Sequence, residues 1–134
     1  MDKYIYPAVF EKDEVAGYTV TFPDLNGAVT EGDDLEEALR MARECLELYL
    51  YGLEEDEEDI PKPSEPVSIN LPVDSFITLV EVRMGSIRDE MMNKSITKNV
   101  SIPRWLERAA AKEKLNFSQV LQYALKERLG INDK

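Results

Sequence analysis

Carboxylates are the side chains in this sequence that could do chemistry, because it holds 27 Asp and Glu residues, no histidine and one cysteine. Without histidine, the usual general acid–base group and the commonest transition-metal ligand are both missing. The lone Cys45 excludes an internal disulfide and a cysteine metal cluster. Carboxylates can still hold Mg²⁺ for phosphodiester cleavage, but that chemistry needs several acids converging on the metal ions, one of them within a central strand.

The placement of the acids argues against such a metal site. The first predicted strand, residues 4–10, contains no acid, and Glu11 and Glu81 are isolated. The acids of the predicted helix spread over a surface instead of converging. We therefore expect no catalytic activity, no bound metal and no cofactor. A metal-dependent nuclease stays open as the second alternative, and it would require Mg²⁺-dependent cleavage by the purified chain.

The charge of the chain reverses in sign near its C-terminal end. Residues 1–92 hold 23 acidic and 7 basic residues, a net charge of −16. Residues 93–134 hold 9 basic and 4 acidic residues, a net charge of +5. An acid surplus by itself aids solubility, but a reversal at one boundary indicates two partners of opposite charge. The basic end suits a polyanion such as nucleic acid, and the acidic part suits a basic protein.

The elements that must position these residues begin with a sheet and one long helix. Alternating aromatic and β-branched residues predict three antiparallel strands, and a later apolar strand is expected to pair with the first. Asp33 or Asp34 caps the helix, with Glu36 and Glu37 in its first turn, and the helix runs to about Leu53. The predicted strands cover residues 4–10, 17–22, 28–30 and 76–82. The acid run 54–59 is predicted to be a solvated loop.

Two faces of this helix are distinguished by their spacing. At about 100° per residue, one apolar face covers the sheet. It consists of Leu35, Ala38, Leu39, Ala42, Leu46, Tyr49, Leu50 and Leu53. A second apolar strip, Met41, Cys45 and Leu48, is flanked by Glu37, Glu44 and Tyr51. Apolar residues bordered by acids suit a protein interface. Packing of this strip on the Pro-rich segment 60–72, or on another copy of the domain, stays open.

The basic end has a different pattern, a predicted strand over residues 94–102 followed by two helices. Pro103 opens the first helix, which ends at Leu115-Asn116, and Ser118 caps the second, which stops at Gly130. Such a unit is too small to bury a core alone, so two copies are expected to pair. Inward positions would be Ile96, Val100 and Ile102, and outward positions Ser95, Thr97, Asn99 and Ser101.

Segment 94–131 resembles the ribbon-helix-helix superfamily through residues 100–106 (VSIPRWL) and 116–121 (NFSQVL). The resemblance implies that a two-stranded ribbon enters the DNA major groove and the second helix start holds a phosphate. The implied DNA-binding residues are Ser95, Thr97, Lys98, Asn99, Ser101, Arg104, Phe117 and Ser118. The outward strand positions are short here, whereas members often carry Arg, Lys or Gln there. A plain dimerisation module stays open for this segment.

The N-terminal part resembles the HicB-type antitoxin domain through residues 17–25 (GYTVTFPDL), 30–33 (TEGD) and 35–39 (LEEAL). The resemblance implies a partial RNase H-like fold and neutralisation of a HicA-type toxin, a small basic ribonuclease that cleaves mRNA with a catalytic histidine. It further implies that the complex represses its own operon. We expect the toxin to meet Glu37, Met41, Glu44, Cys45, Leu48 and Tyr51. Glu44 is the favoured partner for a basic group or the histidine of the toxin.

The expected architecture is therefore α+β, with three parts. Residues 1–83 form an acidic toxin-binding domain, residues 84–93 a linker or short helix, and residues 94–134 a ribbon-helix-helix dimerisation and DNA-binding domain. A higher oligomer than the homodimer stays open. The sequence shows no signal peptide and no apolar run long enough for a membrane span, so a cytoplasmic protein is expected. The first alternative is a free-standing repressor whose acidic domain senses a small ligand.

Overall fold

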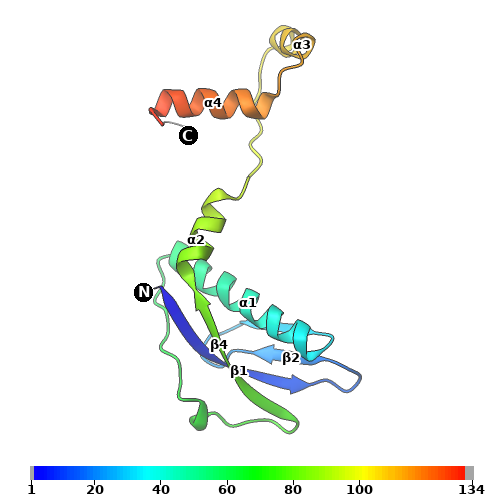
Figure 1. Cartoon of the computed structure of the whole chain (residues 1–134), viewed down its shortest axis with the longest axis vertical. Helices are drawn as coiled ribbons and strands as arrows, with labels where there is room; N and C mark the ends of the chain where they lie inside the picture. The colour runs from blue at the N-terminus through cyan, green and yellow to red at the C-terminus, as the bar shows by residue number, and fades with distance from the viewer. Residues whose placement is uncertain (1, 132–134) are drawn as a thin grey trace. The chain divides into compact units, whose positions relative to one another are not determined.

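A computed structural model describes residues 2–131 of the chain (Figure 1). These residues form two compact units, one ending at Lys94 and the other beginning at Ser95. The first unit contains β1 (Lys3–Lys12), β2 (Tyr18–Thr21), β3 (Val29–Gly32), α1 (Leu35–Glu55), the short 3₁₀ helix η1 (Pro66–Ser68), β4 (Ser75–Arg83) and α2 (Met84–Asn93). The second contains α3 (Arg104–Lys112) and α4 (Phe117–Leu129). The mixed α and β composition is as predicted.

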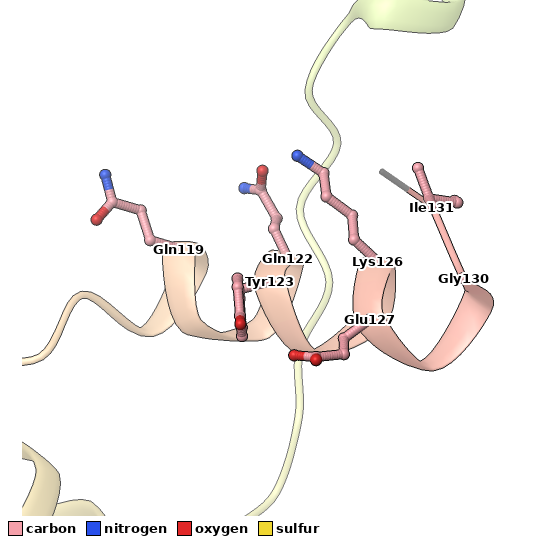
Figure 2. A pocket seen from close by; sticks show the side chains of 7 residues that line it. All are labelled: Gln119, Gln122, Tyr123, Lys126, Glu127, Gly130 and Ile131. Atoms are coloured by element: carbon pink, nitrogen blue, oxygen red, sulfur yellow. The ribbon is translucent and has the colours of Figure 1, made fainter. Parts of the chain in front are cut away.

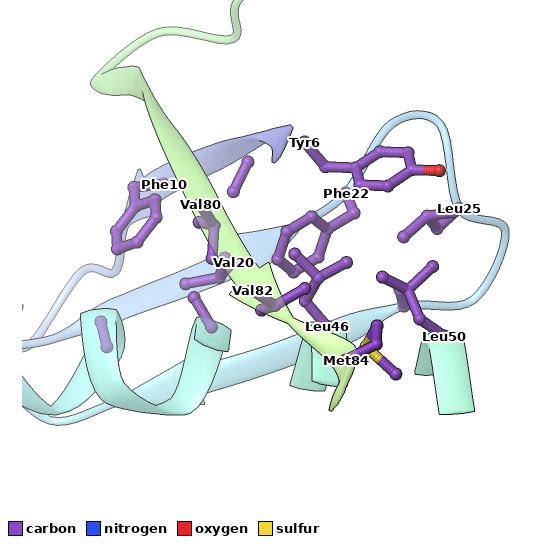
Figure 3. Packing of buried hydrophobic residues seen from close by; sticks show 14 residues of the cluster. Tyr6, Phe10, Val20, Phe22, Leu25, Leu46, Leu50, Val80, Val82 and Met84 are labelled. Atoms are coloured by element: carbon purple, nitrogen blue, oxygen red, sulfur yellow. The ribbon is translucent and has the colours of Figure 1, made fainter. Parts of the chain in front are cut away.

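The first unit is an antiparallel sheet covered on one face by α1. Within the described residues the strand order is β3-β2-β1-β4. The central strand β1 pairs with β4 along its length, from Lys3 opposite Arg83 to Glu11 opposite Ser75. The meander of the first three strands and the pairing of the last strand with the first are both confirmed. The apolar core lies between sheet and helix, and Figure 3 shows Tyr6 and Phe10 of β1 above Leu46 and Leu50 of α1.

The close contact between α1 and β3 depends on small residues. A Cβ atom on Gly32 would lie 2.4 Å from the Ala38 backbone nitrogen, so only glycine fits there. Ala38, Ala42, Leu46 and Leu50 are fully buried, whereas Leu35 and Leu39 are 44% and 41% exposed. The prediction that these two leucines belong to the core face is therefore wrong. Because the helix start approaches the sheet through Ala38, the leucines on either side of it are pushed outward.

Helix α2, the segment predicted to be a linker or short helix, packs against the first unit at its C-terminal end. Its first residue, Met84, is fully buried in the core. Arg88 donates to both carboxylate oxygens of Glu54 at 2.9 and 2.6 Å and to Asp2 at 2.7 Å. Arg88 therefore joins α2 to the end of α1 and to the start of β1. The acid run is not wholly a loop, because α1 continues to Glu55.

The second unit consists of two helices and an extended segment. Residues 94–103 form no strand within the described chain, so the predicted strand 94–102 is absent as a hydrogen-bonded element. A strand needs a partner for its backbone groups, and the described residues provide none. The left-handed stop after α3 lies at Lys114, with φ of 55°, and not at Asn116. Asn116, not the predicted Ser118, caps α4 by accepting from the Gln119 backbone nitrogen at 3.1 Å.

Candidate functional site

The start of α1 explains what one predicted contact residue does. Asp34 caps the helix and accepts from the Glu37 backbone nitrogen at 2.8 Å. The Glu37 carboxylate in turn accepts from the Asp33 backbone nitrogen at 3.0 Å and lies 3.8 Å from Arg40. This arrangement satisfies one backbone donor in the first turn of the helix and the backbone donor of the residue before the cap. Glu37 is therefore occupied in the cap, which leaves it less available to a partner protein.

The predicted apolar strip on α1 divides into buried and exposed members. Cys45 and Tyr51 are half-buried and pack against the core, and burial raises the pKa of the Cys45 thiol. The pKa of Tyr51 is raised mainly by its hydrogen bond with Glu55. Met41 is half-buried, whereas Glu44 is exposed and Leu48 is 59% exposed. The surface that a partner could meet is therefore centred on Glu44 and Leu48.

A shallow groove that the sequence did not reveal lies between α1, the end of β4 and the start of α2. It is lined by Arg43, Glu47, Glu81, Val82, Arg83, Ser86 and Ile87. Glu47 is half-buried, and burial is the main reason why the pKa of its carboxyl is raised. Arg43 opposes this shift, and Glu90 and Glu44 add to it. Within the described residues, Glu47 has no ion pair or hydrogen bond from a side chain.

The sequence of α1 does not single out Glu47, because the groove also needs residues of β4 and α2. The spacing along α1 places Glu47 three residues from Glu44, but nothing local says that α2 and β4 border it. Glu44 and Glu90 carry the same charge as Glu47. Two arginines line the groove: Arg83 is paired with Glu81 at 3.4 Å, and Arg43 is the cation that acts on Glu47. A half-buried carboxylate in such surroundings favours contact with a cation, so Glu47 extends the candidate interface beside Leu48.

The Pro-rich loop does not cover the strip in the described structure. Pro61 accepts a short hydrogen bond from the Tyr6 hydroxyl, and the Ser64 backbone nitrogen donates to Asp24 at 3.0 Å. Figure 1 shows the loop leaving the C-terminal end of α1 and staying away from the rest of that helix. Its fixed contacts are therefore with β1 and the β2–β3 turn, and the exposed face around Leu48 stays open.

The predicted DNA-binding residues all lie on the surface of the second unit. Ser95, Thr97, Lys98, Asn99 and Ser101 are exposed in the extended segment before α3. Arg104 begins α3, and Phe117 and Ser118 begin α4 directly after its cap. The structure thus brings the first five together on one segment and places the other three at two helix starts. No partner strand orders them within the described chain.

Apolar side chains in the second unit are exposed instead of forming a core. Val100 is 64% exposed, Leu106 42% and Leu121 38%. No residue between 95 and 131 is fully buried in the described structure. A surface depression along α4 is lined mainly by polar side chains, and Figure 2 shows Gln119, Gln122 and Lys126 in a row on one side of that helix. Among the described residues of the second unit, nothing covers these apolar side chains.

Residues 2–131 lack two further kinds of site. No helix there combines the length and apolar character needed to cross a membrane. No group of three or more acidic or cysteine side chains is placed to hold a metal ion in the same residues.

Comparison with known proteins connects both units to one family. The family model described as "HicB_like antitoxin of bacterial toxin-antitoxin system" matches residues 6–124, which is most of the chain. The chain belongs to the HicB-like antitoxin family. The match begins in β1 and reaches into α4, so it spans the acidic unit and the basic unit together.

Two curated relatives are similar to the chain over most of its length, and one of them carries the HicB name. "Antitoxin HicB 1" of Photorhabdus laumondii is 36% identical over 103 residues, covering 64% of this chain and 66% of that protein. An uncharacterized 14.9 kDa protein of Haemophilus phage HP1 is 35% identical over 106 residues, covering 76% of this chain and 75% of the phage protein.

Solved structures match nearly the whole HicB-like chain. A structure titled as a toxin–antitoxin complex from Streptococcus pneumoniae has a TM-score of 0.62 and 30% identity, and the match covers 94% of this chain and 99% of that one. The Burkholderia pseudomallei antitoxin HicB has a TM-score of 0.56 and 26% identity, covering 94% and 98%. The mixed α/β fold with its antiparallel sheet is therefore the fold of known HicB structures.

Proposed function

We propose that this HicB-like chain neutralises a HicA-type, mRNA-cleaving toxin through its acidic unit and represses its own operon through its basic unit. The observation that carries the first part is the open face of α1, where exposed Leu48 and Glu44 lie beside the half-buried Glu47. Leu48 offers apolar area at the centre, and the carboxylates offer acceptors for basic groups or the catalytic histidine of the toxin. The toxin is inhibited by steric and electrostatic cover of its active site.

The net charge of the acidic part supports fast recognition of such a toxin. Residues 1–92 carry a net charge of −16, and a small ribonuclease that binds RNA is basic. Complementary charge raises the rate of encounter and disfavours acidic partners. The exposed acids 55–59 at the end of α1 add to this long-range attraction. The resemblance of the sheet and α1 to part of an RNase H fold belongs to the same proposal.

The second part of the proposal concerns a homodimer built by residues 94–131. The exposed apolar residues of α3 and α4, together with an extended segment that lacks a partner strand, support pairing of two copies. Two antiparallel strands would then form a ribbon whose outward side chains, Thr97 and Asn99 among them, reach base edges in the major groove. The N–H groups at the start of α4 would hold a phosphate.

Co-expression tests the toxin part directly. The chain, tagged, is produced together with the small basic open reading frame next to its gene, and the neighbour is also expressed by itself. We expect growth arrest by the neighbour alone, rescue by this chain, and a complex that purifies through the tag. No arrest and no co-purification would overturn the antitoxin proposal and favour a repressor with a ligand-sensing acidic domain.

The operator part is tested with Thr97→Ala combined with Asn99→Ala. These short side chains are the proposed base readers, and their loss should weaken binding to DNA from upstream of the gene by about tenfold or more, at about 1–3 kcal/mol per lost base contact. Rescue from the toxin should be unchanged, because both residues lie outside the acidic unit. Unchanged affinity for the upstream DNA would place base readout elsewhere.

A further inference from the structure

Helix α3 carries a line of cations that the proposed dimer does not use. Arg104, Arg108 and Lys112 follow one another at intervals of four residues, so they lie about 6 Å apart along the helix and about 40° apart around it. The apolar residues at core spacing lie on the other side of the helix by the same count, with Trp105 at the edge beside Lys112; they are Trp105, Leu106, Ala109 and Ala110. Pairing of two copies therefore leaves the cationic line exposed.

Helix stability accounts for Lys112 alone, because a cation in the last turn of a helix is favourable. Like charges four residues apart repel each other and destabilise an isolated helix. All three side chains are exposed, and within the described residues neither Arg108 nor Lys112 forms an ion pair with Glu107 or Glu113. The neighbouring Trp105 is 70% exposed and borders the same side of α3. The unpaired cations thus favour an anionic partner outside the chain.

We infer that Arg104, Arg108 and Lys112 form a contact surface for the phosphate backbone of DNA, which binds independently of base sequence. The inference rests on the proposed DNA binding and extends it to a helix face. The proposed base readers, Thr97, Asn99 and Ser101, are short, so base contacts supply limited affinity. Phosphate contacts supply affinity and fix register without reading sequence, and a line of unpaired cations on each copy meets that need.

The test measures how DNA affinity depends on salt. Arg108→Gln combined with Lys112→Gln is compared with Lys114→Gln combined with Lys126→Gln, called the α4 variant, which removes two positive charges from the turn before α4 and from the side of α4 away from Leu121. The full-length proteins are titrated with a mixed-sequence duplex of about 30 base pairs between low and high salt. Sedimentation of each variant establishes that it is still a dimer.

Each phosphate contact contributes about 0.9 to the slope of log affinity against log salt concentration. The α3 variant loses two contacts in each copy, so its slope should fall by about 3 to 4, and its affinity at 0.1 M salt by more than about 100-fold. The α4 variant should keep the slope of the unchanged protein. Emission of Trp105, the single tryptophan, should change on DNA addition in the unchanged protein and not in the α3 variant.

Three results would overturn the inference, and they differ in what they say of the proposed function. Equal slopes for the α3 variant and the unchanged protein would remove α3 from the DNA surface and leave DNA binding intact. A monomeric α3 variant would place the line in the dimer interface. If the unchanged protein binds neither this duplex nor its upstream DNA, the DNA-binding proposal is wrong as well. The antitoxin proposal would be unaffected, because co-expression with the toxin tests it independently.

Discussion

Glu47 is a side chain whose ionised form lowers the stability of the folded chain and is proposed to bind a cation of the toxin. Its pKa is raised above the ordinary value of about 4.5, chiefly because the carboxyl is half-buried. A raised carboxyl pKa means that the folded chain holds this proton more tightly, so the contribution of Glu47 to stability is fully present below about pH 4.5 and is lost as the pH rises through the raised pKa. At neutral pH the ionised Glu47 therefore weakens the fold slightly, and a cation from the toxin would relieve that cost.

We predict that Glu47→Gln stabilises the free chain at pH 7 and weakens toxin binding. Loss of one charge partner should reduce affinity about 30-fold or more, about 2 kcal/mol. Thermal melting at pH 4 and pH 7 measures the first effect, because the advantage of the variant should shrink at pH 4. Calorimetric titration with the toxin measures the second. Unchanged toxin affinity would exclude Glu47 from the interface, whatever the melting curves show.

Substitution of two glycines in the first unit by alanine should change stability in opposite directions. Gly32→Ala would drive a Cβ atom into the backbone of Ala38, at 2.4 Å from its nitrogen, and neither backbone can move away cheaply. We expect a loss of at least about 2 kcal/mol in the free energy of unfolding. Gly52→Ala, in α1 with nothing within 4 Å of the added atom, should gain up to about 1 kcal/mol. Denaturation in urea, followed by circular dichroism, distinguishes them; equal effects would contradict the close α1–β3 contact.

At the scale of elements, the sequence predicted those strands, caps and helix faces that depend on residues close together in the chain. The alternation in β2, the Asp34 cap and the apolar spacing of α1 could each be seen in a few neighbouring residues. The pairing of β4 with β1 could also be predicted, because a strongly hydrophobic strand is expected to lie inside the sheet beside another strand. The burial of Met84 and the ion pairs of Arg88 could not be predicted, because Arg88 meets Glu54 and Asp2, which lie 34 and 86 residues away.

The candidate interface on α1 was likewise predicted only in part. Glu44 and Leu48 were predicted from spacing on one helix, and both are exposed as expected. Cys45 was placed on the apolar strip and Tyr51 beside it, but both pack against the core. A helical wheel does not show how far around the helix the core extends. The segment 94–102 forms no strand because the hydrogen-bond partner that a strand requires is not within the described chain.

The α1 face is tested as an element by Glu44→Arg combined with Leu48→Asp. One charge reversal and the loss of an exposed apolar contact should weaken toxin binding at least about 100-fold, as expected for the centre of an interface. A matched control is Glu14→Arg with Val15→Asp, which reverses one exposed acid and places an acid at a valine that is 95% exposed in the turn between β1 and β2. Both variants should melt like the unchanged chain. Equal affinities in a pull-down titration would remove the α1 face from the proposal.

At the scale of the whole molecule, the two units solve the problem of burial in different ways. The first closes a core between the sheet and α1, and α2 fastens the end of β4 to it through Met84 and Arg88. The second leaves its apolar residues exposed, and its stability is therefore expected to depend on association. Toxin binding and DNA binding should thus respond differently to protein concentration, because only the second requires a dimer.

Leu121→Glu tests this separation in the full-length chain. Leu121 is 38% exposed and lies on the apolar face of α4, so a buried charge there should prevent pairing of two copies. Analytical ultracentrifugation should show a monomer at micromolar concentration, and affinity for the upstream DNA should fall more than about 100-fold because half the phosphate contacts are lost. Rescue from the toxin should persist.

Tyr123→Glu is the control. Tyr123 is 69% exposed on the opposite side of the same helix, so this variant should leave the dimer and its DNA affinity unchanged. A dimer that survives Leu121→Glu would mean that the chain associates through another surface, and the exposed apolar face of α4 would then have no role in pairing.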